Sequence, residues 1–417
     1  MSTLLLERSL PRFAAARLVS ALGSGRGAGV GPLRLVDGIR PDLPGDGWVH
    51  VTPTLAGICG SDLATLDGRS SRYFEDLVSF PFVPGHEVVG TLAEDAVAAD
   101  GSALAAGSRV VVQPVLGCAA RGLSPLCPAC TAGHVGNCGQ LTLGHLRPGL
   151  QTGFCTDTGG GWSSSGLAAH HSQLFAVPDD LNDADAVTVE PLACAIHAVL
   201  GVPINQGDVV AVVGAGTLGL LVTAALSYLA RTGRCATPSV VLVGARYPHQ
   251  QRLARQFGCA EALPAGQLDR AVRRHAHSMS FGGASGTTGT LSGGADVVID
   301  CVGSAQSIAQ SISMVRPRGT VSLVGMPGKV QIDLAPLWHR EVRLAGTYTY
   351  GVEQPADGPP VSTFALALEV AAAQRTGQLV SATYPLTRFE EALSHAGAAG
   401  RRGSVKIAFD VAKGQTR

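Results

Sequence analysis

The sequence has no surplus of charge of either sign. Its 417 residues include 31 lysines and arginines and 31 aspartates and glutamates. Binding to a phosphate backbone or to an anionic membrane surface depends on an excess of basic side chains, which this chain lacks. We therefore predict that neither nucleic acid nor a membrane is a partner.

Long apolar runs are missing as well. No segment approaches the roughly eighteen uninterrupted apolar residues that a membrane-spanning helix needs. The run of Leu4, Leu5 and Leu6 is followed at once by Glu7 and Arg8, unlike the apolar centre of a signal peptide. A cytoplasmic protein is expected, and its 10 cysteines are better explained as metal ligands and core residues than as disulfides.

Length and composition predict two domains. A chain of 417 residues, 46% of them hydrophobic, is too long for one typical core and has enough apolar side chains for two. Up to about Pro53, short strand-like runs separated by glycine and proline indicate an irregular, mainly β region. Residues 14–31, rich first in alanine and then in glycine, carry no assignment.

Two glycine-flanked motifs supply the first candidate site residues. The motif at residues 57–62 contains Cys59 and Ser61, and His86 and Glu87 lie in a second motif, with His86 27 residues after Cys59. A thiolate, an imidazole and a carboxylate are the ligand mixture of a catalytic zinc. Two plainer explanations stay open at this point: tight packing of the cysteine and an ordinary hydrogen-bonded His–Glu pair.

A cluster of four cysteines gives a stronger signal. They fall within 21 residues and include a Cys-x2-Cys knuckle: Cys118, Cys127, Cys130 and Cys138. Such spacing is typical of a closed tetrahedral thiolate site that holds a loop without a core of its own. Because Pro125, Pro128 and nearby glycines predict a loop here, a structural zinc is favoured over four unrelated thiols.

Other candidates are less specific. Glu190 stands before a proline-started apolar helix, where it either complements the helix dipole or contributes to a metal site. Trp162 lies in a segment rich in glycine and threonine and is a candidate pocket wall, with core packing about equally favoured. Tyr73 and Phe74 are further candidates for a pocket wall, and core packing explains them equally well.

A second architecture begins at residue 207. An apolar strand over residues 208–213 precedes a Gly-x-Gly-x-x-Gly turn and an apolar helix that runs to about Ala230. This context predicts a dinucleotide site, with the pyrophosphate at the helix N-terminus. The residues of the turn are the predicted cofactor-binding residues: Gly214, Ala215, Gly216, Thr217, Leu218 and Gly219.

Strands and helices alternate beyond this turn. Strands are expected at residues 239–244, 295–300 and 319–324, with helices at residues 249–257 and 304–315 between them. The alternation predicts an α/β fold with a doubly wound parallel sheet. Residues 281–294, rich in glycine, serine and threonine, are interpreted as a flexible surface insertion without chemistry. Residues 405–409 are expected to form a strand that returns to the first domain.

The choice of dinucleotide follows from another absence. NAD sites place an acidic residue near the end of the second strand, yet no aspartate or glutamate occurs from Val209 to Ala260. Arg246 stands there instead, and a guanidinium suits the 2′-phosphate of NADP. The sequence thus favours NADP over NAD.

Together these residues resemble the zinc-dependent medium-chain alcohol and polyol dehydrogenases, from about Val49 to the C-terminus. The resemblance implies a GroES-like catalytic domain over residues 1–190, completed by residues 346–417, and a Rossmann domain over residues 191–345. It also implies a homo-oligomer, a dimer or a tetramer.

The resemblance assigns roles to the candidate residues. Cys59 and His86 correspond to ligands of the catalytic zinc, and Glu190 to a further ligand or to a residue that holds the zinc water. Glu87 corresponds to a carboxylate that can exchange into the coordination shell, and Ser61 to the residue that takes the alcohol proton. A glutamate at position 190, where others have cysteine, is more similar to the polyol, glucose and threonine dehydrogenase branch.

The chain departs from the family pattern at two places. Eight residues separate Cys118 from Cys127, where the family usually has two. The extra residues, near 119–126, are expected to bulge outward without moving the thiolates. The prediction of a zinc site in this four-cysteine lobe, residues 118–138, therefore depends most on Cys118. Ala64 stands where many members have a histidine that relays the alcohol proton, which must therefore leave through Ser61, the cofactor ribose or water.

The predicted function is reversible hydride transfer between NADP and a small alcohol or its carbonyl, such as a polyol, a sugar or a secondary alcohol. Two alternatives are a zinc-free double-bond reductase and a non-catalytic dinucleotide-binding protein. The first is disfavoured by the metal-ligand motifs, and the second by a proton-accepting serine beside them.

Overall fold

A computed structural model describes residues 1–282, 289–355 and 358–413 of the chain. It divides into two compact units, one formed by Met1–Glu190 with Ala367–Arg417 and the other by Pro191–Leu366. The division falls inside two helices, α5 (Val189–Leu200) and α11 (Thr363–Gln374). The predicted catalytic and dinucleotide-binding domains, with their boundaries at 190 and 346, stay predictions.

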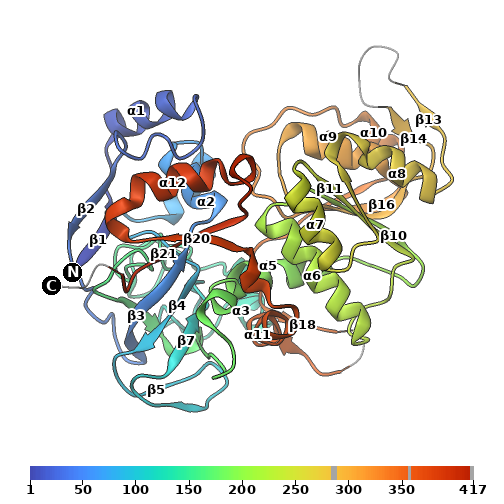
Figure 1. The fold of residues 1–417 in the computed structure, drawn as a ribbon. Helices are drawn as coiled ribbons and strands as arrows, with labels where there is room; N and C mark the ends of the chain where they lie inside the picture. The colour runs from blue at the N-terminus through green and yellow to red at the C-terminus, as the bar shows by residue number, and fades with distance from the viewer. Residues whose placement is uncertain (283–288, 356–357, 414–417) are drawn as a thin grey trace. The chain divides into compact units, whose positions relative to one another are not determined.

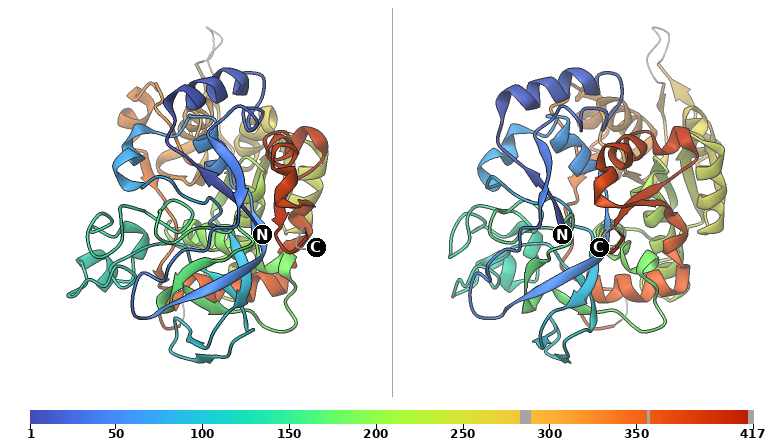
Figure 2. Two further views of the ribbon diagram at one scale, coloured as in Figure 1. Left: turned by 90° about the vertical axis from the view of Figure 1, so that its left-hand side faces the viewer. Right: turned by 60° about the vertical axis from the view of Figure 1, so that its left-hand side comes forward.

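A seven-stranded sheet forms the centre of the first unit. Its strand order is β20-β21-β3-β4-β7-β9, with β8 also paired to β3. The strands are β3 (Trp48–Gly57), β4 (Val88–Leu92), β7 (Arg109–Val112), β8 (Leu167–His170), β9 (Leu174–Ala176), β20 (Val380–Tyr384) and β21 (Lys406–Asp410). β21 pairs antiparallel with β3 and parallel with β20, so residues 405–409 return to the first unit as a strand, as expected. Figure 2 shows this red C-terminal segment beside the blue N-terminal strands of the same unit.

Smaller elements surround this sheet. They are β1 (Ser2–Leu6), α1 (Leu10–Ser20), β2 (Leu33–Asp37), α2 (Gly60–Leu66), η1 (Arg72–Leu77), β5 (Ala96–Val97), β6 (Ala103–Leu104), α3 (Pro128–Thr131), η2 (Val135–Asn137), η3 (His171–Gln173), α4 (Asp183–Ala186), η5 (Thr376–Leu379), η6 (Leu386–Arg388), α12 (Phe389–Gly397) and η7 (Ala399–Arg402). β1 and β2 form a separate antiparallel pair.

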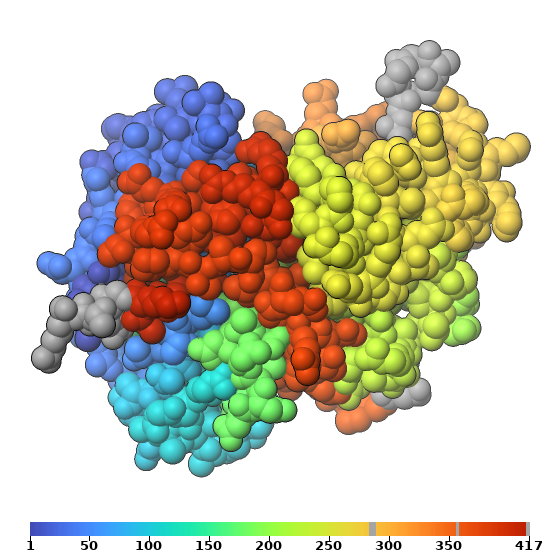
Figure 3. Space-filling model, in the orientation of Figure 1, coloured from blue at the N-terminus to red at the C-terminus, as the bar shows by residue number. Residues whose placement is uncertain are grey.

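The α1 helix was not expected from the sequence, which indicated an irregular β region there. Its first turn contains Pro11, whose fixed φ suits a helix start, and its alanines favour helix. The loop after it is tied to the end of α2: Asp67 accepts hydrogen bonds from the Ser24 hydroxyl (2.6 Å) and the Gly25 amide (3.2 Å). Ala28 and Leu393 of α12 belong to one buried cluster. In Figure 3 the blue N-terminal residues and the red residues of α12 share one surface of this unit.

Trp162 belongs to the core of the first unit. Its side chain is fully buried, its ring packs edge-on against Phe409, and its indole N–H donates to the carbonyl of Gly57 (3.1 Å). Of its two predicted locations, the structure selects the core. Tyr73, by contrast, is 76% exposed, and its ring contacts only the half-buried Phe74 among the described aromatic pairs.

The second unit is a parallel six-stranded sheet with strand order β12-β11-β10-β15-β16-β17. The strands are β10 (Val209–Val213), β11 (Val240–Ala245), β12 (Glu261–Pro264), β15 (Ala295–Asp300), β16 (Val315–Leu323) and β17 (Arg343–Gly346). The order reverses at β10, as in a doubly wound nucleotide-binding fold. β10 is buried along its whole length, which explains its uninterrupted apolar sequence.

Helices cover both faces of this parallel sheet. They are α6 (Thr217–Arg231), α7 (Pro248–Gln256), η4 (Ala265–Gln267), α8 (Leu268–His275), α9 (Ala305–Met314) and α10 (Ala335–His339). α6 packs on α7 and α8 packs on α9, and Figure 1 shows α6 and α7 side by side against β10 and β11. The predicted α/β fold with a doubly wound sheet is confirmed, with element ends shifted by a few residues.

The remaining strands of this unit are short. β13 (Ser280–Phe281) pairs with β14 (Thr290–Leu291), and β18 (Val352–Glu353) pairs with β19 (Val361–Ser362). The predicted insertion at 281–294 thus begins and ends in a two-stranded hairpin, while its residues 283–288 lie outside the described residues. Among the described helices, none combines the length and apolar character that crossing a bilayer requires.

Candidate metal and dinucleotide sites

The structure brings three of the predicted catalytic-site residues together. One donor atom each from Cys59, His86 and Glu87 lie within 4.8 Å of one another. Cys59 stands at the N-cap of α2, two residues after the end of β3, and His86 and Glu87 immediately precede β4. Because β3 and β4 pair antiparallel, with Ala56 opposite Val88, the end of β3 and the start of β4 bring these segments together.

Asp62 orients this cluster. Its Oδ2 accepts the backbone N–H of Cys59 at 2.9 Å, and its Oδ1 lies 3.4 Å from Nδ1 of His86. Burial disfavours a charged imidazole, but the nearby carboxylate of Asp62 and the Cys59 thiol raise the pKa of His86 well above its usual value. The carboxylate therefore orients the ring through its contact with Nδ1, and it favours a strongly donating imidazole.

Lys406, for which no role was predicted, lies beside the same cluster. Its ammonium forms an ion pair with Oε2 of Glu87, and both side chains are almost completely buried, at 2% and 1% exposure. The ammonium also approaches the carbonyl of Ile58 at 3.5 Å. Burial opposes the charge, but Glu87, Cys59 and Glu190 together raise the pKa of Lys406 above its usual value.

Glu190 and Ser61 are placed less directly. Glu190 lies in the first turn of α5, is 7% exposed and acts electrostatically on Lys406, but it is not part of the group of three donors within 4.8 Å. Ser61 is the second residue of α2 and is half-buried. Both residues thus belong to the same region of the first unit as Cys59.

The donors present fit a catalytic zinc. A thiolate, an imidazole and a carboxylate are first-choice ligands of Zn²⁺. In the described part of the chain, Oδ1 of Asp62 and Nδ1 of His86 are buried without a well-formed hydrogen bond. Buried polar groups usually have partners, and a ring held between a carboxylate and a metal is a common arrangement for a ligating histidine.

The four predicted thiols of the second cluster also meet. The Sγ atoms of Cys118, Cys127, Cys130 and Cys138 lie within 4.8 Å of one another, with Cys118 at 3.6 Å and Cys127 at 3.9 Å from Cys138. Backbone N–H groups of Cys130 and Gly139 lower the pKa of Cys127 to about 6, whereas burial raises the pKa of Cys130 and of Cys138. Four converging thiols fit a closed tetrahedral zinc site.

Most of the insertion after Cys118 is exposed, as expected for an outward bulge, but one of its side chains turns inward. Arg121 is fully buried there, and its guanidinium donates to the carbonyls of Leu116 (3.0 Å), Leu143 (2.9 Å) and Gly149 (2.7 Å). A buried guanidinium needs many acceptors, and these carbonyls come from both sides of the cysteine lobe. Arg121 therefore ties the two sides of the lobe together, and the four thiols stay grouped.

The dinucleotide loop has the predicted form of strand, turn and helix. Residues 214–219 join β10 to α6, and a Cβ on Gly219 would lie 1.8 Å from the carbonyl oxygen of Gly214. Only glycine permits this close approach of helix and strand. Nearby, Oδ1 of Asp300 accepts the backbone N–H groups of Val302 (2.8 Å) and Gly303 (3.1 Å), which fixes the loop after the neighbouring strand.

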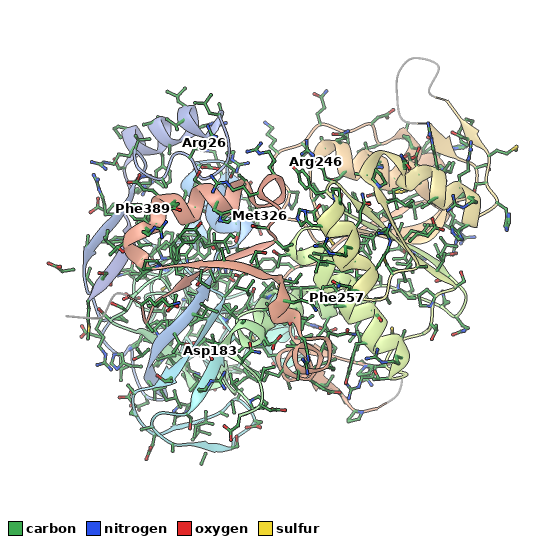
Figure 4. All side chains as sticks on the ribbon, viewed as in Figure 1. Arg26, Asp183, Arg246, Phe257, Met326 and Phe389 are labelled. Carbon is green, nitrogen blue, oxygen red and sulfur yellow. The ribbon has the colours of Figure 1, made fainter. Side chains whose placement is uncertain are left out.

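Arg246 lies directly after β11 and is labelled in Figure 4. Its side chain is exposed, and its guanidinium carbon lies 5.9 Å from the ring centre of Tyr247. The Tyr247 ring in turn stacks on His249. An exposed guanidinium at the end of the second strand is available to an anionic group of a ligand.

Sequence reasoning missed three residues that shape these sites: Asp62, Arg121 and Lys406. Asp62 was part of a recognised motif, but spacing alone did not show its contact with His86. Lys406 carried a usable signal, because a lysine that starts a strand and is followed by the apolar run Ile407–Phe409 requires a partner if it is buried. Arg121 had no comparable signal, since arginine in a loop is normally exposed.

Comparisons with known proteins agree with this geometry. A model of the alcohol dehydrogenase GroES-like domain matches residues 45–179, and a model of the zinc-binding dehydrogenases matches residues 224–367. A protein of Mycobacterium tuberculosis assigned as an alcohol dehydrogenase is 30% identical over 287 residues, which are 68% of this chain and 70% of that protein. A sorbitol dehydrogenase of Halalkalibacterium halodurans is 26% identical over 322 residues, 76% of this chain and 80% of that protein.

Among solved structures, a protein of Sinorhizobium meliloti assigned to the zinc-binding dehydrogenases and bound to NADP has a TM-score of 0.65 to this chain. The two are 27% identical, and the match covers 90% of this chain and 95% of that one. The similarity thus extends over both units.

Proposed function

The chain belongs to the zinc-dependent medium-chain dehydrogenase family, and on that premise we propose that Cys59, His86 and a carboxylate hold the zinc at which it oxidises an alcohol. The chain is a nicotinamide-dependent alcohol oxidoreductase. The observation that carries the assignment of the site is the cluster of the half-buried Cys59 with the buried His86 and Glu87.

Each residue of the cluster has a distinct task. Cys59 and His86 are the fixed ligands, and Asp62 sets the orientation of the imidazole. Glu190 supplies the further carboxylate, either as a ligand or by holding a water. Bound zinc supplies a Lewis acid that favours ionisation of a substrate hydroxyl near neutral pH. Ser61 accepts the proton that the hydroxyl loses.

The onward path of this proton has one feature particular to the chain. Position 64, on α2 three residues after Ser61, is a buried alanine. A methyl group neither accepts nor donates a proton, so a histidine relay from this position is excluded. The proton that Ser61 accepts must therefore leave by another route, such as water.

The cofactor proposed is NADP, bound at residues 214–219 with Arg246 at its 2′-phosphate. Bound nicotinamide supplies the hydride acceptor for alcohol oxidation. The N-terminus of α6 offers unpaired N–H groups to a pyrophosphate. Arg246 offers charge-assisted donors to a phosphate, and the S. meliloti relative was solved with NADP.

A polyol or a secondary alcohol is the proposed substrate class. Relatives include a sorbitol dehydrogenase and proteins assigned as D-xylulose reductases, the latter 28% identical over 368 residues in Rhizobium meliloti. A zinc-free double-bond reductase is the second candidate, but it gives no use to the converging donors Cys59 and His86.

A homo-oligomer in the cytoplasm completes the proposal. Strand β17 lies at the edge of its sheet and is largely exposed, and Trp338 and Leu334 of the preceding segment are 80% and 55% exposed. An open sheet edge with exposed apolar side chains is a common association surface.

The test is an absorbance assay at the nicotinamide band with a panel of polyols, sugars and secondary alcohols, run with each cofactor and combined with metal analysis. We expect zinc in the purified protein, turnover of at least one polyol or secondary alcohol, and a preference for NADP that the Arg246→Ala variant loses. Absence of zinc together with reduction of activated double bonds would support the reductase instead.

A further inference from the structure

Glu87 has two competing partners in the first unit. One of its carboxylate oxygens lies within 4.8 Å of donor atoms of Cys59 and His86, while Oε2 forms the buried ion pair with Lys406. A carboxylate oxygen that is engaged by an ammonium is a poorer metal ligand than a free one. The partner that Glu87 selects therefore determines whether a metal held by Cys59 and His86 keeps a position open for substrate.

The backbone is shaped to keep the ion pair in place. A Cβ on Gly57 would lie 1.9 Å from Oε2 of Glu87 and 2.9 Å from Cε of Lys406, so this position must be glycine for the pair to form here. Lys406 also approaches the carbonyl of Ile58 at 3.5 Å, which adds a second acceptor for the ammonium. Residues from three segments thus converge on one contact.

We propose that Lys406 is a positioning residue that withholds Glu87 from the catalytic metal and so keeps a coordination position free for the substrate hydroxyl. The inference rests on the proposed zinc site. Removing the ammonium would leave a fully buried carboxylate without a cation, a costly state that binding to the metal relieves. Lys406→Met should therefore turn Glu87 into a permanent ligand.

A simpler role for Lys406 is to neutralise a buried carboxylate for the sake of folding. The two roles differ in what happens at the metal. If Lys406 only supports folding, its loss lowers stability but leaves metal coordination unchanged. If it positions Glu87, its loss changes the number of ligands in protein that is still folded.

Cobalt substituted at the catalytic site, with zinc retained in the four-cysteine lobe, reports the number of ligands through its d–d absorption. We expect the wild-type protein to give the intense bands of four-coordinate cobalt and Lys406→Met to give the weaker bands of a higher coordination number. Lys406→Arg should retain the wild-type spectrum. Release of catalytic zinc to a chelator should slow by about tenfold in Lys406→Met, the scale on which residues behind metal ligands act.

A double variant keeps the test decisive if Lys406→Met folds poorly. Lys406→Met with Glu87→Gln removes both charges and leaves a weaker ligand, so we expect four-coordinate cobalt and normal zinc release. Arg340→Met is the matched control, since Arg340 is a buried cation of the other unit that donates only to carbonyls, including that of Val315 at 2.6 Å. It should lower stability without changing the spectrum.

An unchanged spectrum in folded Lys406→Met, or an equal change in the double variant, would overturn the inference. Neither result bears on the zinc site itself. The proposed function fails instead if the wild-type protein takes up no cobalt or zinc at Cys59 and His86.

Discussion

The two donor clusters of the first unit differ in how much protein surrounds them. Cys59, His86 and Glu87 lie at the ends of two central strands of a seven-stranded sheet, and their charges are already balanced by Asp62 and Lys406. The four thiols lie in a loop with two short helices, α3 and η2. The fold of the sheet holds the first cluster in place without a metal, whereas a metal bound by the second cluster is needed to fold the loop around it.

The charges of the two clusters also indicate that only the four-cysteine lobe depends on a metal. In the lobe, the pKa of Cys127 is lowered to about 6 while burial raises those of Cys130 and Cys138, so the thiols cannot all ionise without a cation among them. At the other cluster an ammonium and an acid–imidazole pair are part of the protein. Loss of metal should thus disorder the lobe and leave the catalytic cluster folded.

The largest expected effect comes from Cys59→Ser. We expect it to remove catalytic zinc and reduce turnover to background, because a hydroxyl is a far weaker zinc ligand than a thiolate. The fold should persist, since the sheet and the Asp62–His86 contact remain. Metal analysis, activity and thermal unfolding check this, with Cys235→Ser, a half-buried thiol of the second unit, as control. Full activity in Cys59→Ser would refute the assignment.

Cys130→Ser should disorder the four-cysteine lobe and leave the catalytic cluster intact. We expect loss of one zinc and faster amide hydrogen exchange over residues 117–149, because a structural zinc supplies much of the free energy that folds such a loop. Strands β3 and β4 should keep their protection. If exchange rises equally in the strands and in the lobe, the two clusters are not independent and the comparison fails.

Arg121→Met tests whether hydrogen bonds within the protein stabilise the lobe in addition to the zinc. Its removal leaves several buried carbonyls without donors, and we expect a loss of about 3 kcal/mol in the free energy of unfolding. Denaturant titration measures this. Arg147→Met is the matched control: its exposed guanidinium lies 3.6 Å from Asp157 and should contribute less than about 1 kcal/mol. Equal losses would mean that Arg121 has no special role.

The sequence predicted what depends on local pattern. The turn at residues 214–219, the four cysteines and the motifs around Cys59 and His86 each carry their chemistry within a few neighbouring residues. Contacts made only by the tertiary fold were missed. Lys406 and Glu87 are 319 residues apart, and the residues next to each of them do not indicate that the two side chains meet. The inward turn of Arg121 and the core position of Trp162 likewise depend on packing that local pattern does not record.

The smallest predicted effect concerns acid sensitivity at the base of the lobe. Trp48 packs with Leu116 and Leu146 of the lobe segment, and its ring contacts His170 at 5.6 Å. Burial, together with the charges of His171 and His145, lowers the pKa of His170 to about 4.

The sign of the pH dependence follows from this lowered pKa. The unfolded chain, in which a histidine has a pKa of about 6.5, takes up the proton first as pH falls. Stability that is complete above pH 6.5 is therefore lost progressively down to about pH 4. In His170→Gln the unfolding midpoint should fall less between pH 7 and pH 5 than in the wild-type protein, while His134→Gln, at an exposed position of the lobe, should follow the wild type. If the unfolding midpoint of His170→Gln falls with pH as steeply as that of the wild type, His170 is not the cause. The acid sensitivity would then come from protonation of the thiols and loss of metal.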